Sequence, residues 1–359
     1  MANEIYSKSW WGSGVCFNTV GWGLVYKPYA GCGAVPALLL ALETRATYYE
    51  NETCTIATLD EIEAIAYTAP PVPSPFVISV KTDNTGSSAN NQFTIPTTGT
   101  GYNYEVKTSD GQIITGNTGN TTITFPSNGT YDVEILGDFP RIYFNNTGDK
   151  AKLLDIKNWG DIVWTSMLKA FRGCSNLTVL TATDVLICPI DLTSMFNGCS
   201  NLNTDLTNFN TSSVTSIGQM FAFTNNFNGD ITTWDTSNVT SSYYAFRSAN
   251  AFNQNIGGWN TSSIVNMGDM FGGSIKAFNQ DISGWDVNQV TQFARFMQGV
   301  TLSTANYDAL LIAWDAQGAM SYSGTVPFGN SQYTLGGAAE AARTSLISKW
   351  GAITDGGGV

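Results

Sequence analysis

Acidic side chains recur at one position of an internal repeat, and paired carboxylates are the first chemistry that this sequence could support. Successive copies carry Asp205, Asp230, Asn255 and Asp281 at that position. If the copies stack, Asp205 and Asp230 would stand about 5 Å apart, the separation of the carboxyl groups in retaining glycosidases. The amide in the third copy favours a turn position instead, or a weak Ca²⁺ ligand. We therefore expect no enzyme and no cofactor, with Asp205, Asp230 and Asp281 as weak cation candidates.

The absence of histidine narrows the chemistry further. Without it the chain cannot form Ser-His-Asp or Cys-His catalytic groups, or metal sites that use imidazole. Cys174 and Cys199 lie 25 residues apart, at the same position of the repeat, and later copies have small residues there. This spacing predicts two stacked free thiols, with a disulfide as the alternative.

Composition argues against two classes of partner. The 359 residues include few charged side chains (12%) and have a formal net charge of −12, which repels phosphate backbones. No apolar run reaches the roughly 18 residues of a membrane span. Met1 is followed by neither a basic segment nor an apolar one, so we expect no secretion signal. We predict a protein that neither binds nucleic acid nor inserts into a membrane.

A phenylalanine repeat must position these side chains. Five phenylalanines lie at intervals of 25 residues: Phe171, Phe196, Phe221, Phe246 and Phe271. A fixed period of this size predicts units that bury an apolar ladder only by stacking on one another. The Val-Thr pairs that recur in the copies predict one short strand in each unit (Val214-Thr215, Val239-Thr240, Val290-Thr291). The asparagines of a second column predict a ladder that caps backbone groups (Asn203, Asn228, Asn253, Asn279).

The clearest copies read F-N-x-D-I-x-x-W-D-T-S-x-V-T and resemble the BspA-type leucine-rich repeat over residues 196–297. The resemblance implies a mainly β fold with some α, in which a leucine-rich-repeat-like solenoid spans residues 149–300. Members of that family are surface proteins of bacteria, often adhesins, and virion proteins of phages. The resemblance therefore implies surface recognition, not catalysis.

Three segments surround the repeats. Short alternating runs predict a small β-sandwich at 76–148, which resembles the polycystic-kidney-disease type of immunoglobulin-like domain. Residues 301–359 predict a cap with one helix that starts at Ser303 and a second that spans Ala338 to Trp350. A proline-rich hinge at 68–75 separates the sandwich from an N-terminal head at 1–67.

The head is rich in aromatic residues and glycine, and this pattern resembles the N-terminal regions of phage virion proteins. Its aromatic side chains either pack a small core or dock to other virion proteins. The docking candidates are Trp10, Trp11, Trp22 and Tyr26.

These observations predict a bacteriophage tail fibre or spike that is assembled in the host cytoplasm and displayed on the virion surface. Its repeats would bind a host glycan or protein receptor, and its subunits would form a homo-oligomer, with a trimer as one arrangement. The alternatives are a structural decoration subunit without a receptor and an adhesin of a bacterial cell surface. The receptor-face candidates are the aromatic and polar side chains that recur in the copies: Trp234, Asp235, Trp259, Asn260, Trp285 and Asp286.

Overall fold

The computed structural model describes residues 17–19, 24–26, 73–273, 277–318 and 321–359. The chain divides into two compact units, Met1–Val72 and Pro73–Val359. The division falls inside the segment expected as a hinge, 68–75. In the first unit, strands β1 (Phe17–Thr19) and β2 (Leu24–Tyr26) form an antiparallel pair.

The second unit begins with a six-stranded sheet in the order β10-β9-β3-β8-β5-β6. Alternate side chains of its central strands are buried, as expected for a sheet with one covered face. The strands span Phe76–Lys81 (β3), Asn103–Thr108 (β5), Ile113–Asn117 (β6), Thr130–Asp138 (β8), Leu153–Asn158 (β9) and Val179–Leu180 (β10).

A separate antiparallel pair, β4 (Gln92–Ile95) and β7 (Thr121–Thr124), contributes Phe93 and Ile123 to the same apolar core. Short strands from β3 to β8 thus occupy the segment whose alternating runs predict a small sandwich. Because β9 pairs with β3, this sheet continues past residue 148, the boundary expected from the sequence.

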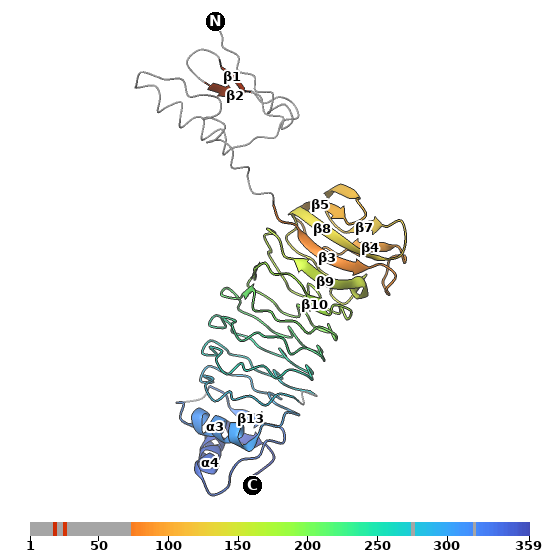
Figure 1. Ribbon diagram of the computed structural model, residues 1–359. Coiled ribbons are helices and arrows are strands. Elements are labelled where there is room, and N and C mark those ends of the chain that lie inside the picture. The colour runs from red at the N-terminus through yellow and green to blue at the C-terminus, as the bar shows by residue number, and fades with distance from the viewer. Residues whose placement is uncertain (1–16, 20–23, 27–72, 274–276, 319–320) are drawn as a thin grey trace, which may run out of the picture. The chain divides into compact units, whose positions relative to one another are not determined.

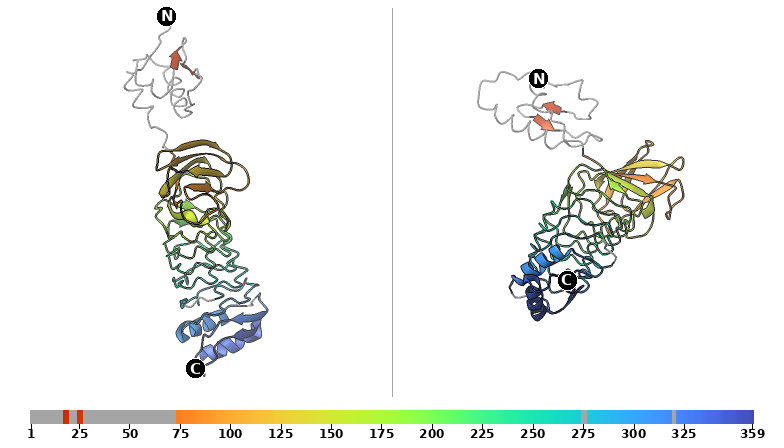
Figure 2. Two further views of the ribbon diagram at one scale, coloured as in Figure 1. Left: turned by 90° about the vertical axis from the view of Figure 1, so that its right-hand side faces the viewer. Right: turned by 60° about the horizontal axis from the view of Figure 1, so that its bottom comes forward.

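Beyond this sheet the chain runs in stacked coils, which Figures 1 and 2 show between β10 and the C-terminal helices. We define a coil as one repeat, from one bridge residue to the next, and name it by that residue. The bridge residues pair in parallel from coil to coil: Asp191, Ser216, Ser241, Asn266 and Gln292.

Aromatic ladders fill the inside of the coils, as the 25-residue period predicts. The rings of Phe196 and Phe221 lie 6.1 Å apart, and those of Phe221 and Phe246 lie 5.6 Å apart. A second ladder stacks Trp234 on Trp259 at 6.3 Å, with only 4° between the ring planes. Buried offset stacks of this kind are favourable beyond the area that they bury.

The coils are joined by a ribbon of turns instead of by strands. The Gln219 and Phe221 amides donate to the Tyr243 and Ala245 carbonyls of the next coil, at 2.8 and 2.9 Å. Within the coil, the Met220 amide donates to the Ile217 carbonyl three residues back, at 3.1 Å. These internal bonds bend the segment into overlapping turns, so it pairs with its neighbour without becoming extended.

The fold class expected from the sequence, a leucine-rich-repeat-like solenoid, is therefore wrong. The described residues form mostly small sheets with a few helical segments, and their coils do not close into a solenoid with a strand in each unit. The Val-Thr pairs expected as strands are not strands. The Thr240 amide donates to the Thr215 carbonyl of the preceding coil at 2.8 Å, but the bridge between the coils is a single residue, Ser216 or Ser241. The prediction of a mainly β fold agrees in part with the small sheets that are present.

The C-terminal segment covers the last coil. Ser303 caps α3 (Thr304–Asp315) by accepting a hydrogen bond from the Asn306 amide, as the sequence predicts. Helix α4 spans Ala338–Trp350, also as predicted, and the parallel pair β13 (Gly324–Pro327) and β14 (Gly351–Thr354) is an addition. No helix among the described residues has the length and apolar character needed to cross a bilayer.

Short strands β11 (Leu186–Ile187) and β12 (Phe209–Asn210) pair in parallel at the start of the coils. A short 3₁₀ helix, η2 (Lys150–Lys152), leads into β9.

Candidate binding surface

The three tryptophans expected to face a receptor are buried. Trp234, Trp259 and Trp285 are 5%, 4% and 0% exposed. Each indole Nε1–H donates to a carbonyl of the preceding coil: Leu206 at 2.9 Å, Ile231 at 3.3 Å and Ile256 at 3.0 Å. The prediction that these rings offer aromatic planes to a sugar is wrong, because the indoles pack inside and satisfy their one donor there.

The polar residue after each tryptophan shapes a turn at the surface. The Oδ1 atoms of Asp235, Asn260 and Asp286 accept the amide hydrogen of the residue two positions on, at 2.9 to 3.1 Å. The hydrogen bond from the Ser237 hydroxyl also lowers the pKa of the Asp235 carboxyl. These side chains are accessible in part, but their best acceptor atoms already serve the backbone.

The candidate cation ligands also serve turns. Asp205 Oδ1 accepts the Asp230 amide at 2.8 Å, and Asp230 Oδ1 accepts the Thr232 amide at 2.8 Å. Asp281 Oδ1 accepts the Ser283 amide at 2.9 Å. Within the described ranges no group of three or more Cys, Asp or Glu side chains could hold a metal ion. The contacts favour turn formation at this position.

The asparagine column forms the backbone-capping ladder that the sequence predicts. The Oδ1 atoms of Asn203, Asn228 and Asn253 accept the amide of the next asparagine in the column, at 3.0, 2.8 and 2.9 Å. Asn279 Oδ1 accepts the Ser303 amide at 2.7 Å, which carries the ladder into the cap of α3. This column therefore fixes the spacing of the coils, and the prediction is confirmed.

Cys174 and Cys199 are free and buried, so the prediction of two free thiols is also confirmed. Cys199 Sγ lies 3.1 Å from the Phe171 carbonyl. Burial raises the pKa of both thiols, which keeps them protonated.

Residues that the sequence did not predict as a site gather on the side of the coils that carries the bridge residues. We call this the ladder side. Tyr243 and Tyr244 lie with their ring centroids 4.1 Å apart. The guanidinium of Arg247 lies 4.7 Å from the centre of the Tyr244 ring, and Arg295 Nη2 donates to the Tyr244 hydroxyl at 3.0 Å. We call Tyr243, Tyr244, Arg247, Asp269 and Arg295 the tyrosine–arginine cluster, and it spans three coils.

Asp269 anchors the cluster. Its carboxylate is 1% exposed and pairs with Arg247 through Oδ1 and with Arg295 through Oδ2, the latter at 2.6 Å. The hydrogen bond that Arg295 donates to the Asp269 carboxylate raises the pKa of the Arg295 guanidinium, which therefore stays charged. A buried carboxylate that holds two arginines fixes their orientation without the entropy loss that free arginines would suffer on binding a ligand.

Tyr243 is partly exposed to solvent on the ladder side. Its side chain is 37% exposed, and the neighbouring coils have Gly218 and Gly268 at its position. A Cβ atom at residue 268 would lie only 3.3 Å from Tyr243 Cδ2, so a larger residue there would crowd the ring. The glycine at residue 268 thus leaves room for the ring, which stays partly accessible to a ligand.

Phe223 stands in an unusual conformation beside this cluster. Its φ is +61°, in the left-handed region, and its side chain is 50% exposed. Most other coils have glycine at this position, as at Gly198 and Gly273. A bulky residue in this region stores strain that the surrounding bonds must hold, here the bond from the Phe223 amide to the Arg247 carbonyl at 2.8 Å. Ser248 has the same conformation in the next coil, with a φ of +57°, so the left-handed turn belongs to the repeat and the exposed phenylalanine ring is what departs from it.

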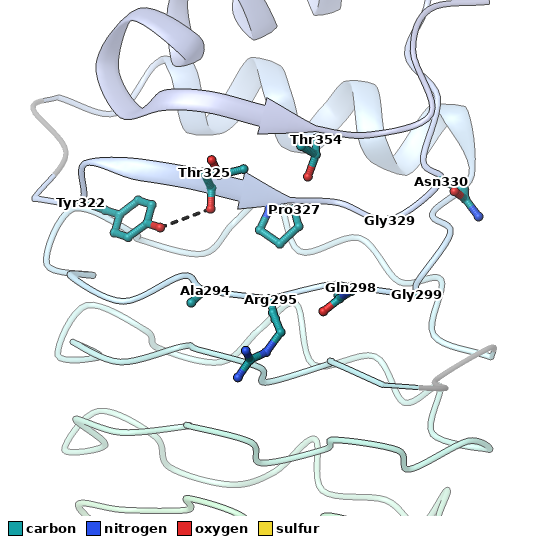
Figure 3. Close-up of a pocket in the computed structure, with 10 residues that line it drawn as sticks. All are labelled: Ala294, Arg295, Gln298, Gly299, Tyr322, Thr325, Pro327, Gly329, Asn330 and Thr354. Atoms are coloured by element: carbon teal, nitrogen blue, oxygen red, sulfur yellow. Dashed lines mark hydrogen bonds between the residues drawn. The ribbon is translucent and has the colours of Figure 1, made fainter.

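A groove of about 620 Å³ opens on the ladder side, between the Gln292 coil and β13. Figure 3 shows Thr325 and Pro327 on one wall and Gln298 on the other, with the Tyr322 hydroxyl bonded to the Thr325 carbonyl. The Arg295 side chain extends from the coil away from β13 in this view, toward the preceding coils. Arg295 lines the groove and also belongs to the tyrosine–arginine cluster, so it links the two, and the other lining side chains are uncharged.

The sequence contains the signal for this surface as departures from the repeat, not as the repeat itself. At the Phe223 position the other coils have glycine or serine, and the coils that flank Tyr243 have glycine at its position. Because the other coils stack with a small residue at these positions, the aromatic side chains of Phe223 and Tyr243 are not required for stacking and indicate a surface role.

The docking candidates of the head are not placed. Trp10, Trp11 and Trp22 lie outside the described residues, and Tyr26 belongs to β2.

Residues 190–314 match the model of a family described as "Mycoplasma protein of unknown function, DUF285". The matched segment runs from the end of the first copy through the coils to α3. No curated protein and no solved structure matches the chain.

Proposed function

We propose that this chain is a bacteriophage virion surface protein, a tail fibre or spike, that recognises the host surface through the ladder side of its coils. The observation that carries the proposal is the tyrosine–arginine cluster with Phe223 beside it. Aromatic residues and arginine are the side chains that most often dominate binding energy at interfaces.

The fixed geometry of this surface supports recognition. The coils are joined by backbone hydrogen bonds on the ladder side and by stacked rings inside, so the exposed side chains stand on a rigid support. Side chains that are already ordered before binding lose less conformational entropy when the complex forms. Several copies on one virion would add avidity to a weak single site.

A second candidate is an adhesin on a bacterial cell surface. The similarity of residues 190–314 to a family described from Mycoplasma favours it, because mycoplasmas are bacteria and not viruses. The position of the gene separates the two candidates. Neighbouring capsid and tail genes are expected for the virion protein, and neighbouring chromosomal surface-protein genes for the adhesin.

Binding to cells tests the recognition itself. Labelled full-length protein should adhere to the bacterium in whose genome or culture the gene is found, and unlabelled protein should compete with infection. A Tyr243→Ala variant should lose most of this adhesion, because it removes an exposed ring that the receptor would contact. The variant should stay folded, since Tyr243 is not one of the buried core residues.

Tyr143→Ala is the matched control. Tyr143 also pairs with an arginine, since Arg141 lies 4.4 Å from its ring centre, but it belongs to a different part of the chain. Adhesion equal to wild type in Tyr243→Ala, or an equal loss in both variants, would contradict recognition through the ladder side.

A further inference from the structure

We infer that the tyrosine–arginine cluster binds a polysaccharide whose sugars carry carboxylate groups. The inference rests on the proposed function and names the class of receptor that the surface would take. It follows from the free hydrogen-bond donors of the cluster, its charge and its continuity with the neutral groove.

Three guanidinium nitrogens of the cluster remain available as donors. Arg247 uses Nη1 for Asp269, and Arg295 uses Nε and Nη2 for Asp269 and Tyr244. Among the residues that the structure describes, Arg247 Nε, Arg247 Nη2 and Arg295 Nη1 have no hydrogen-bond partner. A planar guanidinium matches the planar carboxylate in geometry, and charge-assisted bonds of this kind are about twice as strong as neutral ones.

The charge of the cluster selects an anion. Two arginines oppose one carboxylate, Asp269, which leaves a surplus of one positive charge on the ladder side of a chain with a net charge of −12. The surplus is local, so it attracts a carboxylate that reaches the cluster, whereas the net negative charge of the chain acts on the ligand over longer distances and is screened by salt.

The remaining surface fits the uncharged parts of a sugar chain. The exposed ring of Tyr243 can cover the C–H face of a pyranose, with glycine on either side to admit it. On the far side of Arg295, the groove offers hydroxyl and amide groups from Gln298, Thr325 and Asn330 and has no acidic lining residue. A chain of sugars can therefore run from Tyr243 past Arg295 into the groove.

Calorimetry with defined polymers tests this inference on the full chain. The probes are polygalacturonate, alginate and polysialate, with dextran and methyl-esterified polygalacturonate as neutral comparisons. We expect at least one carboxylate polymer to bind tenfold or more tightly than the neutral ones, with an affinity that falls as salt is added.

Two variants assign the binding to the cluster. Arg247→Lys keeps the charge that faces Asp269 but removes the planar fork, and Tyr243→Ala removes the stacking ring. Each should weaken binding about tenfold, the loss expected for one charge-assisted bond or one stacked ring. Arg172→Lys is the matched control, since Arg172 occupies the same repeat position as Arg247 in an earlier copy of the repeat and lies outside the cluster. Unchanged thermal unfolding would show that each variant is folded.

The outcomes separate this inference from the proposed function. Adhesion to cells without binding to any carboxylate polymer would overturn the inference and leave host recognition standing. Tighter binding to a polymer of glycerol phosphate than to the carboxylate polymers would also overturn it, in favour of a phosphate ligand. An equal loss of binding in Arg172→Lys and Arg247→Lys would show that the site is not at the cluster.

Discussion

The sequence varies differently on the inward face of the coils and on their outward face, the ladder side. Inside, the same aromatic type returns in coil after coil, as with Phe196, Phe221 and Phe246, because each ring packs on the one before it. On the ladder side, equivalent positions change from glycine to phenylalanine to serine, at Gly198, Phe223 and Ser248. Repetition is what packing requires, so specificity for a partner has to come from the positions that do not repeat.

Two phenylalanines in one coil test this contrast most strongly. Phe221 is fully buried and packs on four aromatic neighbours, whereas Phe223 is half exposed. Phe221→Ala should lower the free energy of unfolding by about 3–5 kcal/mol, through lost burial and the cavity left behind. Urea unfolding followed by tryptophan fluorescence measures this loss. Phe223→Ala should cost less than about 1 kcal/mol, and equal losses would end the distinction between the two faces.

The period of the sequence reveals the inward face almost completely. A ring at every twenty-fifth residue has no other use than to stack, so the Phe ladder and the Asn203–Asn228–Asn253 ladder follow from spacing and residue type alone. The turns that join one coil to the next could not be predicted from spacing and residue type. Gln219 adopts a left-handed conformation with a φ of +57°, and a glutamine gives no sign of such a turn in the sequence.

The outward face was mispredicted for a related reason. Tryptophan occurs both in cores and at interfaces, and the side that Trp259 faces depends on whether its N–H finds a carbonyl inside. It finds the Ile231 carbonyl in the preceding coil, a contact that spacing along one chain cannot reveal. The tyrosine–arginine cluster escaped prediction because the search followed residues that recur, and Tyr243 does not.

A buried ion pair beside the six-stranded sheet should make that region sensitive to acid, in contrast to the exposed turn carboxylates of the coils. Lys152 Nζ lies 3.8 Å from Asp149 Oδ1, and both side chains are fully buried. Burial alone would raise the pKa of Asp149, but hydrogen bonds from Ser88 and from the Thr94 amide hold it below its usual value. Asp149→Asn should cost on the order of 3 kcal/mol at pH 7, because it leaves the buried lysine unpaired.

The sign of the pH dependence follows from the lowered pKa. The stabilisation is fully present above the unfolded-state pKa of about 3.9 and is lost as the pH falls through the folded-state pKa. Urea midpoints at pH 7, 4 and 3 should therefore show the difference between wild type and Asp149→Asn shrinking with acid. Asp235→Asn, at an exposed turn of the coils, is the control and should change the midpoint little at any pH. A difference for Asp149→Asn that grows with acid would contradict the pairing.

Strain at Phe223 gives a prediction in the opposite direction. Its left-handed backbone disfavours any side chain, so Phe223→Gly should raise the free energy of unfolding by about 1 kcal/mol. Phe223→Ala keeps a Cβ atom and should gain nothing, which makes it the matched comparison. Both variants should weaken adhesion to host cells, since both remove the exposed ring. A variant that gains stability and keeps full adhesion would show that the strain at this position serves no binding role.

The smallest expected effect is the absence of a reaction. Burial raises the pKa of Cys188 to about 12 and raises those of Cys174 and Cys199 as well, so at pH 8 all three thiols are protonated and enclosed. Because the thiolate is the reactive form, an hour in iodoacetamide at pH 8 should leave these three residues unmodified, as peptide mass spectrometry would measure. The same treatment in urea should modify them fully. Modification of Cys199 in the folded protein would mean that its coil opens to solvent, and an inward face that opens could no longer hold the outward side chains rigid.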